Sequence, residues 1–195
     1  MLQRTATPTA APSARPRATH TERKSEMNRL FPTKNDLPEA TRARVADLLN
    51  KRLADCIDLQ TQCKQAHWNV KGPTFIALHK LFDEINEDVE EYEDLLAERV
   101  VQLGGMAEGT ARSVAERTTL DEYPHDLAGD AGHVDALSSA LAAFGSGSRK
   151  AIAQVEALED AATVDILVEI SRGTDKWLWF VEAHQQGETG SQSRR

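Results

Sequence analysis

The sequence predicts an all-α protein, a bundle of four long helices with a long crossover that contains a short helix. Apolar residues recur at three- and four-residue intervals through most of residues 37–186, as they do on the buried faces of helices, and there is almost no strand signal. Breaks at Lys71-Gly72-Pro73 and Gly104-Gly105 separate the helical stretches. Residues 106–126 form a long connection, which suits a bundle with one crossover better than one built from simple hairpins.

The first two helices are expected to pair around the first break. One helix is predicted from Pro38 to about Ala66, with Asp36 as its cap. The next is predicted from Thr74 to Leu103, ending at the glycine pair. The residues of the first helix that have core-facing spacing are Val45, Leu48, Leu49, Leu53, Cys56 and Leu59.

The crossover and the last two helices complete the expected bundle. A short helical turn is predicted at Val114 to Arg117, and a third long helix over residues 130–157. A fourth helix is predicted to follow Asp160 to Thr163 and to run to about Gln186. Its inward-facing residues are expected to be Ile166, Ile170, Trp177, Phe180 and Val181.

The two ends of the chain differ from this central part. We expect a disordered basic arm over residues 1–36, a helical domain over 37–186 and a flexible tail over 187–195, because the ends lack apolar periodicity. Met27 is an alternative start that would remove most of the arm. Residues 1–26 have a net charge of +3, from five basic and two acidic residues. Because the whole chain has a net charge of −8, the remaining residues have a net charge of −11.

Composition favours a soluble cytoplasmic protein. No stretch approaches the roughly 20 apolar residues that a membrane span needs, and the N-terminus has no secretory apolar region. Cys56 and Cys63 lie about 10 Å apart along one predicted helix, too far for a disulfide within the chain. We expect them to be small, half-buried apolar residues in a reducing compartment.

Metal-binding chemistry is concentrated between His67 and Glu98. His79 and Asp83 are four residues apart on one helix, as are Asp94 and Glu98, and imidazoles with carboxylates suit iron, zinc or manganese. The two pairs are offset by about 22 Å of helix, so one chain cannot bring them to one metal. A second copy, antiparallel across a two-fold axis near residues 88–89, would place His67, His79 and Asp83 opposite the partner's Asp94 and Glu98.

Plainer interpretations of these residues remain open. Residues 83–98 contain nine acids, most of which are expected to form a solvated helix face. A two-metal site inside one bundle is disfavoured, because the predicted long helices carry no Glu-x-x-His motif and Glu182-Ala-His184 has the wrong spacing. Spacing alone therefore leaves the ligand assignment undecided.

The motifs in this region resemble the Dps proteins, the ferritin-like DNA-protecting proteins of starved bacteria. The similarity lies in the run from His67 to Gly72, in Phe75, Leu78-His79 and Asp83, and in Asp94 with Ala97-Glu98-Arg99. A second block extends from Glu169 to His184, and the resemblance covers about residues 37–186. Trp68 neighbours the proposed site within the motif and is expected mainly to pack there.

The resemblance implies a ferritin-like bundle that assembles into a hollow shell of twelve identical subunits. It implies a ferroxidase that oxidises Fe²⁺ at sites between subunits, preferably with hydrogen peroxide, and stores ferric mineral, which spares DNA during oxidative stress. The implied ligands are His67, His79 and Asp83 of one subunit with Asp94 and Glu98 of its partner. Acidic pores are also implied, for which the turn between the last two helices offers Glu156, Glu159, Asp160 and Asp165.

Non-specific DNA binding, with nucleoid association, is a further expectation. Basic residues at both ends of the chain would contact phosphates, and many copies on one shell would add their weak affinities. These residues are Arg4, Arg15, Arg17, Arg23, Lys24, Arg194 and Arg195. Two alternatives stay open: a mainly DNA-coating nucleoid protein with little iron chemistry, and a structural oligomer in which replacing His67 and His79 affects only stability.

Overall fold

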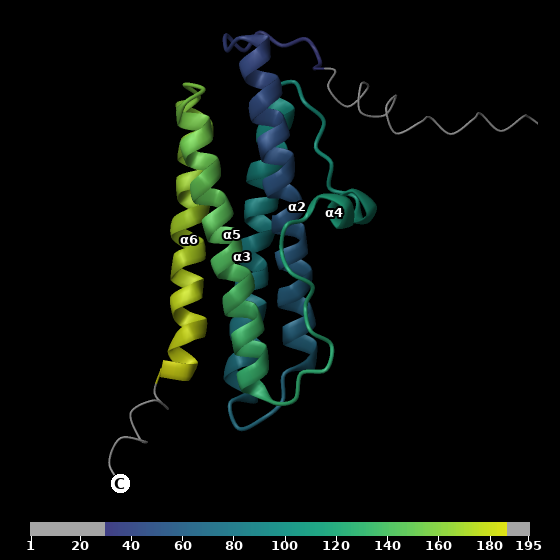
Figure 1. Cartoon of the computed structure of the whole chain (residues 1–195), viewed down its shortest axis with the longest axis vertical. Coiled ribbons are helices and arrows are strands. Elements are labelled where there is room, and N and C mark those ends of the chain that lie inside the picture. Colours follow the sequence, from purple (N-terminus) through teal and green to yellow (C-terminus); the bar gives the residue numbers. More distant parts are fainter. Residues whose placement is uncertain (1–29, 187–195) are drawn as a thin grey trace, which may run out of the picture.

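The computed structural model describes residues 30–186, and this part of the chain contains five helices and no strand. They are α2 (Glu39–Asn69), α3 (Phe75–Gln102), α4 (Ala111–Arg117), α5 (Asp130–Glu156) and α6 (Ala161–Gln186). The four long helices lie along a common axis, and the short α4 lies outside them, against α2 (Figure 1). The predicted all-α bundle is confirmed.

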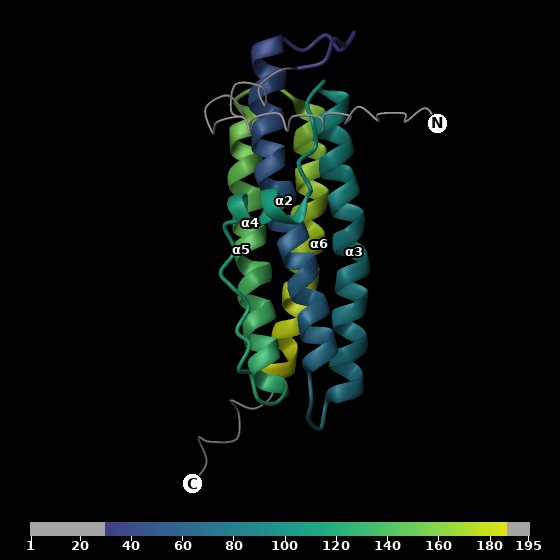
Figure 2. The ribbon, with the colours of Figure 1, turned by 90° about the vertical axis from the view of Figure 1, so that its right-hand side faces the viewer.

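Two helical hairpins form the bundle. α2 packs along α3 and α5 packs along α6, while contacts between α2 and α5 and between α3 and α6 join the two hairpins. α3 ends at the opposite end of the bundle from the start of α5, so the connection between them runs the length of the molecule (Figure 2). This crossover makes α3 and α5 parallel, which short connections would not allow.

Helix ends agree with the sequence to within about three residues. α2 continues beyond the expected Ala66 to Asn69, because the break at Gly72 comes only after another helical turn. The prediction of Asp36 as the cap was wrong: Pro38 holds the capping position and no side chain caps the helix. α3 ends at Gln102 with Leu103 as its cap, as expected just before Gly104, whose φ of +87° is a conformation that favours glycine.

The core is a continuous set of apolar side chains from all four long helices, including the fully buried Leu49, Phe82, Leu96, Phe144 and Leu167. Burial of each such side chain is worth about 1.5–3 kcal/mol. No helix among residues 30–186 is long and apolar enough to cross a membrane.

Three expected core positions lie at its margin. Leu48 and Ile166 are only partly buried. Phe180 is 36% exposed, so the prediction that it faces inward was wrong. It lies about 100° around the helix from the buried Val181, and it packs edge-on against Trp177 and Trp179 at ring-centroid distances of 5.5 and 4.9 Å.

Cys56 and Cys63 are both fully buried and unpaired, rather than half-buried as expected. The Cys56 thiol donates to the carbonyl of Val89 on α3 at 3.5 Å. Burial raises the pKa of both thiols well above the usual range. Each cysteine therefore packs in the core as a small apolar residue.

Polar contacts fasten the crossover to α2. The buried carboxylate of Asp55 forms an ion pair with Arg52 at 2.7 Å and accepts the backbone N–H of Thr119 at 2.7 Å. Further along, Gln62 donates to the carbonyl of Asp121 at 3.0 Å. These contacts satisfy backbone groups that the irregular segment cannot pair with itself, and they fix its path over the bundle.

A buried ion pair fixes the start of α6. The Arg99 guanidinium on α3 contacts Asp160 at 2.8 Å and donates to the Thr163 hydroxyl at 2.8 Å. Asp160 is only 2% exposed, and it also accepts the backbone N–H of Thr163 at 3.1 Å. One carboxylate thus caps α6 and joins it to α3.

Candidate metal site

His67 and His79 form the centre of the site, one from the end of α2 and the other from the start of α3. Each ring Nδ1 lies against the backbone carbonyl of the other residue, at 2.7 Å for His67 and 2.8 Å for His79. The rings stack with centroids 3.7 Å apart. A carbonyl only accepts, so each Nδ1 donates, and in a ring that carries one proton Nε2 has the lone pair that a metal needs.

Asp83, the third expected ligand of this group, lies one helical turn beyond His79. Its carboxylate oxygen is 3.8 Å from Nδ1 of His67 and 2.6 Å from Nζ of Lys64. The hydrogen bond from Lys64 is the main cause of a lowered Asp83 pKa, with smaller contributions from the two histidines. Asp83 is therefore an ionised carboxylate beside two imidazoles at neutral pH.

Asp94 and Glu98 lie elsewhere on α3, and both are exposed. At about 100° per residue, His79, Asp83, Asp94 and Glu98 fall within roughly 100° of one another around α3, so they share one face of the helix. Along the axis the two pairs remain about 22 Å apart. Within residues 30–186 of one chain, no group of three or more potential ligands is arranged to hold a metal ion. A metal site using all five residues thus needs a second chain.

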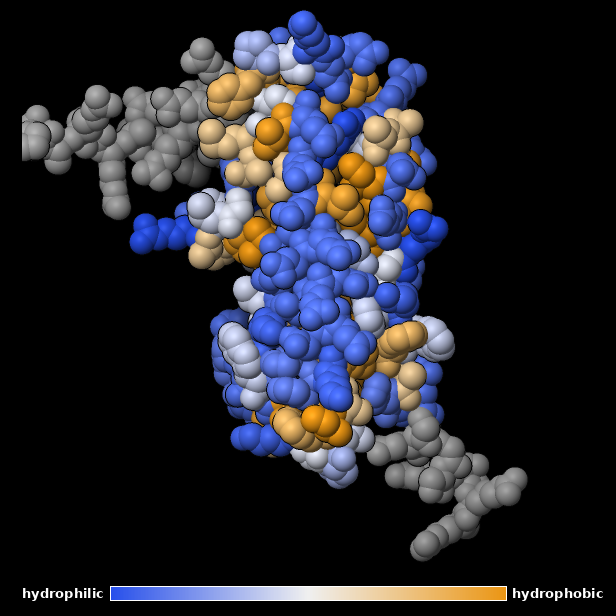
Figure 3. Space-filling view, turned by 180° about the vertical axis from the view of Figure 1, so that it is seen from behind, coloured by the Kyte–Doolittle hydropathy of each residue, from blue (hydrophilic) through white to orange (hydrophobic). Residues whose placement is uncertain are grey.

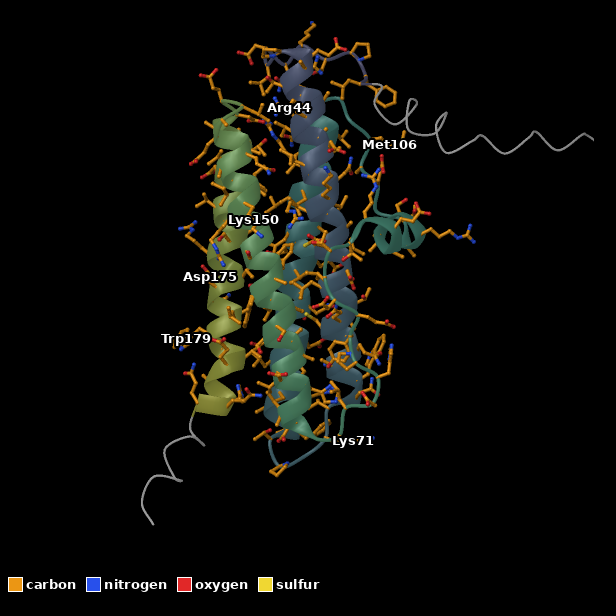
Figure 4. All side chains as sticks on the ribbon, in the orientation of Figure 1. Arg44, Lys71, Met106, Lys150, Asp175 and Trp179 are labelled. Atoms are coloured by element: carbon orange, nitrogen blue, oxygen red, sulfur yellow. The ribbon has the colours of Figure 1, made fainter. Side chains whose placement is uncertain are left out.

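Exposed apolar residues lie next to the histidine pair along the chain. Trp68 is 67% exposed and Ile76 is 60% exposed, while the Phe75 ring lies 5.1 Å from the His79 ring. They lie near the turn that contains Lys71, at the lower end of the bundle in Figure 4. Seen from the α3 side, a hydrophilic band runs along much of the bundle, with hydrophobic patches beside it (Figure 3).

The residues expected to line a pore have different environments. Glu156, Glu159 and Asp165 are exposed near the turn between α5 and α6. Asp160 instead is buried against Arg99 and caps α6, so its carboxylate is not available to a passing cation. The basic residues expected to contact DNA, Arg4, Arg15, Arg17, Arg23, Lys24, Arg194 and Arg195, lie outside the described residues 30–186.

Sequence reasoning missed two groups near the site. Lys64 precedes His67 by three residues, a spacing that places both on one face of α2 and that pointed toward the site. Glu93 adjoins Asp94, yet it has a buried carboxylate oxygen without a hydrogen-bond partner. Burial, together with Glu90 and Asp94, raises the pKa of Glu93 to about 7. Its position among many acids gave no signal of this burial.

Replacing Glu93 by glutamine should stabilise the fold in a pH-dependent way. Because the folded-state pKa is about 7 and the ordinary value is 4.5, folding opposes ionisation, a cost absent below pH 4.5 and complete above pH 7. Glu93→Gln should therefore raise the free energy of unfolding by up to about 3 kcal/mol at pH 8 and change it little near pH 4.5. Urea denaturation at the two pH values measures this, and an equal effect at both would contradict the pKa.

Comparison with known proteins identifies similar sequences and structures. A ferritin-like domain model matches residues 46–188. A DNA protection during starvation protein of Agrobacterium fabrum is 46% identical over 154 residues, covering 79% of this chain and 95% of the relative. One from Mycolicibacterium smegmatis is 36% identical over 146 residues, covering 75% and 79%.

Solved structures agree with these relatives. DpsC from Streptomyces coelicolor superposes with a TM-score of 0.78 at 32% identity, covering 82% of this chain and 93% of that one. Mycobacterium smegmatis Dps gives 0.75 at 34% identity, covering 79% and 94%. The four long helices and their crossover thus define a ferritin-like protein. Within that class, the chain belongs to the Dps family.

Proposed function

We propose that this protein is a ferroxidase and iron store that oxidises Fe²⁺, preferably with hydrogen peroxide, at sites shared between two subunits. The observation that supports it most is the histidine pair, whose reciprocal Nδ1–carbonyl contacts leave Nε2 of each ring free of that role, with the Asp83 carboxylate 3.8 Å from Nδ1 of His67. This is half of a ligand set for iron. In this proposal the partner's Asp94 and Glu98 supply the other half.

A two-fold pairing of α3 helices would make two such sites at once. Antiparallel packing about an axis near residues 88–89 would place each histidine pair opposite the partner's two acids, because a two-fold interface repeats every contact. The exposed Trp68, Phe75 and Ile76 beside the histidines would become buried in the same contact. We propose that further copies close a hollow shell of twelve subunits, with Glu156, Glu159 and Asp165 drawing cations to its pores.

The oxidation would use the site residues to hold two ferrous ions close together. Each ion gives one electron to the same hydrogen peroxide molecule, its O–O bond breaks, and two protons complete two molecules of water. Because both electrons come from adjacent ions, no hydroxyl radical is released. Anionic carboxylates and neutral imidazoles stabilise the ferric product, which then moves into the mineral.

Removing the partner's acids tests this function directly. Ferrous iron and hydrogen peroxide are added anaerobically to purified protein, and ferric absorbance is followed. Asp94→Ala with Glu98→Ala should slow oxidation by more than about 100-fold, since loss of residues that merely support ligands already costs about 10–100-fold.

The matched control is Glu122→Ala with Asp126→Ala, which removes the same charge from exposed crossover positions. This control should oxidise iron like the unaltered protein. Equal rates in all three proteins would overturn the site and favour a structural or DNA-coating role.

Protection of DNA by direct contact is a second proposed activity, and the +3 charge of residues 1–26 favours it. Binding would be to phosphates, without base recognition, and would weaken steeply with salt. Deleting residues 2–26 should abolish retardation of linear duplex DNA in gels at low salt while leaving iron oxidation unchanged. Undiminished retardation by the shortened chain would exclude the arm as the DNA contact.

A further inference from the structure

Lys64 forms an ion pair with Asp83, a carboxylate that the proposed iron site needs. Nζ of Lys64 lies 2.6 Å from Oδ1 of Asp83, the same oxygen that Nδ1 of His67 approaches at 3.8 Å. Lys64 and His67 are three residues apart on α2, so one face of that helix directs both side chains to α3. The Asp83 carboxylate is therefore already paired with a single positive charge, that of the Lys64 side chain.

The fold does not need this ion pair. The side chains of Lys64 and Asp83 are 32% and 41% exposed, and pairs so open to water contribute little to stability. The histidines are positioned by each other's backbone carbonyls, not by the lysine. The buried apolar faces of α2 and α3 already hold the two helices together. What the ammonium group changes is the charge at the site.

Its electrostatic effect follows from the position of its charge. The Lys64 ammonium group lies 2.6 Å from the Asp83 carboxylate, within hydrogen-bonding distance. The same positive charge neutralises that carboxylate and repels any divalent ion that approaches it. A lysine has a flexible stem and can move its charge aside, which a rigidly held arginine would do less readily.

We propose that Lys64 is the resident counter-ion of Asp83, and that it lowers the affinity of the His79–Asp83 half of the site for divalent cations. This inference rests on the proposed function and names a residue that sets how that site fills. Metal would bind Asp83 only after the ammonium group moves away. Of the two ions in a site, the one bound by Asp83 would bind more weakly, so Lys64 would separate the two affinities.

Metal titration without oxidant tests the proposal. Co²⁺, which is not oxidised in this assay, is titrated into the assembled protein by calorimetry at constant pH. Lys64→Gln should bind the second ion per site about 10–100-fold more tightly than the unaltered protein. Lys64→Arg keeps the charge and should retain the weak second step. Lys51→Gln, which removes a lysine from the exposed pair with Asp47, should change nothing.

The outcomes separate this inference from the function on which it rests. Superimposable titrations of Lys64→Gln and the unaltered protein, with metal binding lost in Asp94→Ala/Glu98→Ala, would overturn the role of Lys64 alone. A gain in Lys64→Arg equal to that in Lys64→Gln would also overturn it, because charge would then not be the cause. Absence of site-specific Co²⁺ binding in every protein would overturn both proposals.

Discussion

Iron oxidation should return when two inactive variants are assembled together. One variant carries His67→Ala and His79→Ala, and the other carries Asp94→Ala and Glu98→Ala. In a mixed two-fold pair, the histidines of the second variant meet the acids of the first, and one of the two sites is complete. Random co-assembly makes about half of all pairs mixed, so about a quarter of the sites should be restored.

The measurement is the rate of ferric absorbance after the variants are unfolded together and reassembled. A mixture of the separately assembled variants is the control, since it contains the same chains without mixed pairs. Restoration only after co-assembly would establish that ligands come from two chains. No restoration, in a preparation shown to contain mixed pairs, would contradict the two-fold site even if each variant alone were inactive.

Breaking the buried ion pair between α3 and α6 should have the largest effect on stability. Asp160→Ala leaves the Arg99 guanidinium, only 10% exposed, without its counter-ion, and it removes the cap of α6. Loss of one partner of a buried pair costs about 3–5 kcal/mol, more than a surface pair is worth. The midpoint of urea unfolding should fall accordingly.

The matched comparison is Asp175→Ala on α6, which breaks the exposed ion pair of Asp175 with Arg149 of α5. Asp175 is labelled in Figure 4. These side chains are 56% and 50% exposed, so the loss should stay below about 1 kcal/mol. Similar losses in the two variants would show that water reaches Arg99, contrary to its burial. Such a result would return Asp160 to the set of exposed acids near the turn.

The helices could be predicted closely because apolar periodicity and glycine breaks are local signals. The pairing of His67 with His79 also had a local cause, since the two residues flank one tight turn between antiparallel helices. Lys64 and Asp83 were harder, because their contact depends on how α2 and α3 are rotated about their axes. Arg99 and Asp160 are separated by 61 residues, and one of the two was expected in a pore.

Acid-rich segments of the sequence gave the least information about which side chains are buried. Along α3 the sequence offered no distinction between the exposed Asp94 and the partly buried Glu93 beside it, because both are carboxylates in a run of like residues. Which of them faces water is set by helix packing, at an angle of about 100° per residue. Phe180 illustrates the same limit for apolar residues, since it lies at the edge of the buried stripe.

The burial of the two cysteines bears on how such a chain survives the oxidant it is proposed to consume. Peroxide attacks the thiolate form of cysteine, and a thiol whose pKa is far above neutrality supplies almost none. Cys56 and Cys63 combine that raised pKa with complete exclusion from solvent. Sulfenic acid formation should therefore be slow at both, and the core should keep its packing through repeated cycles of peroxide reduction.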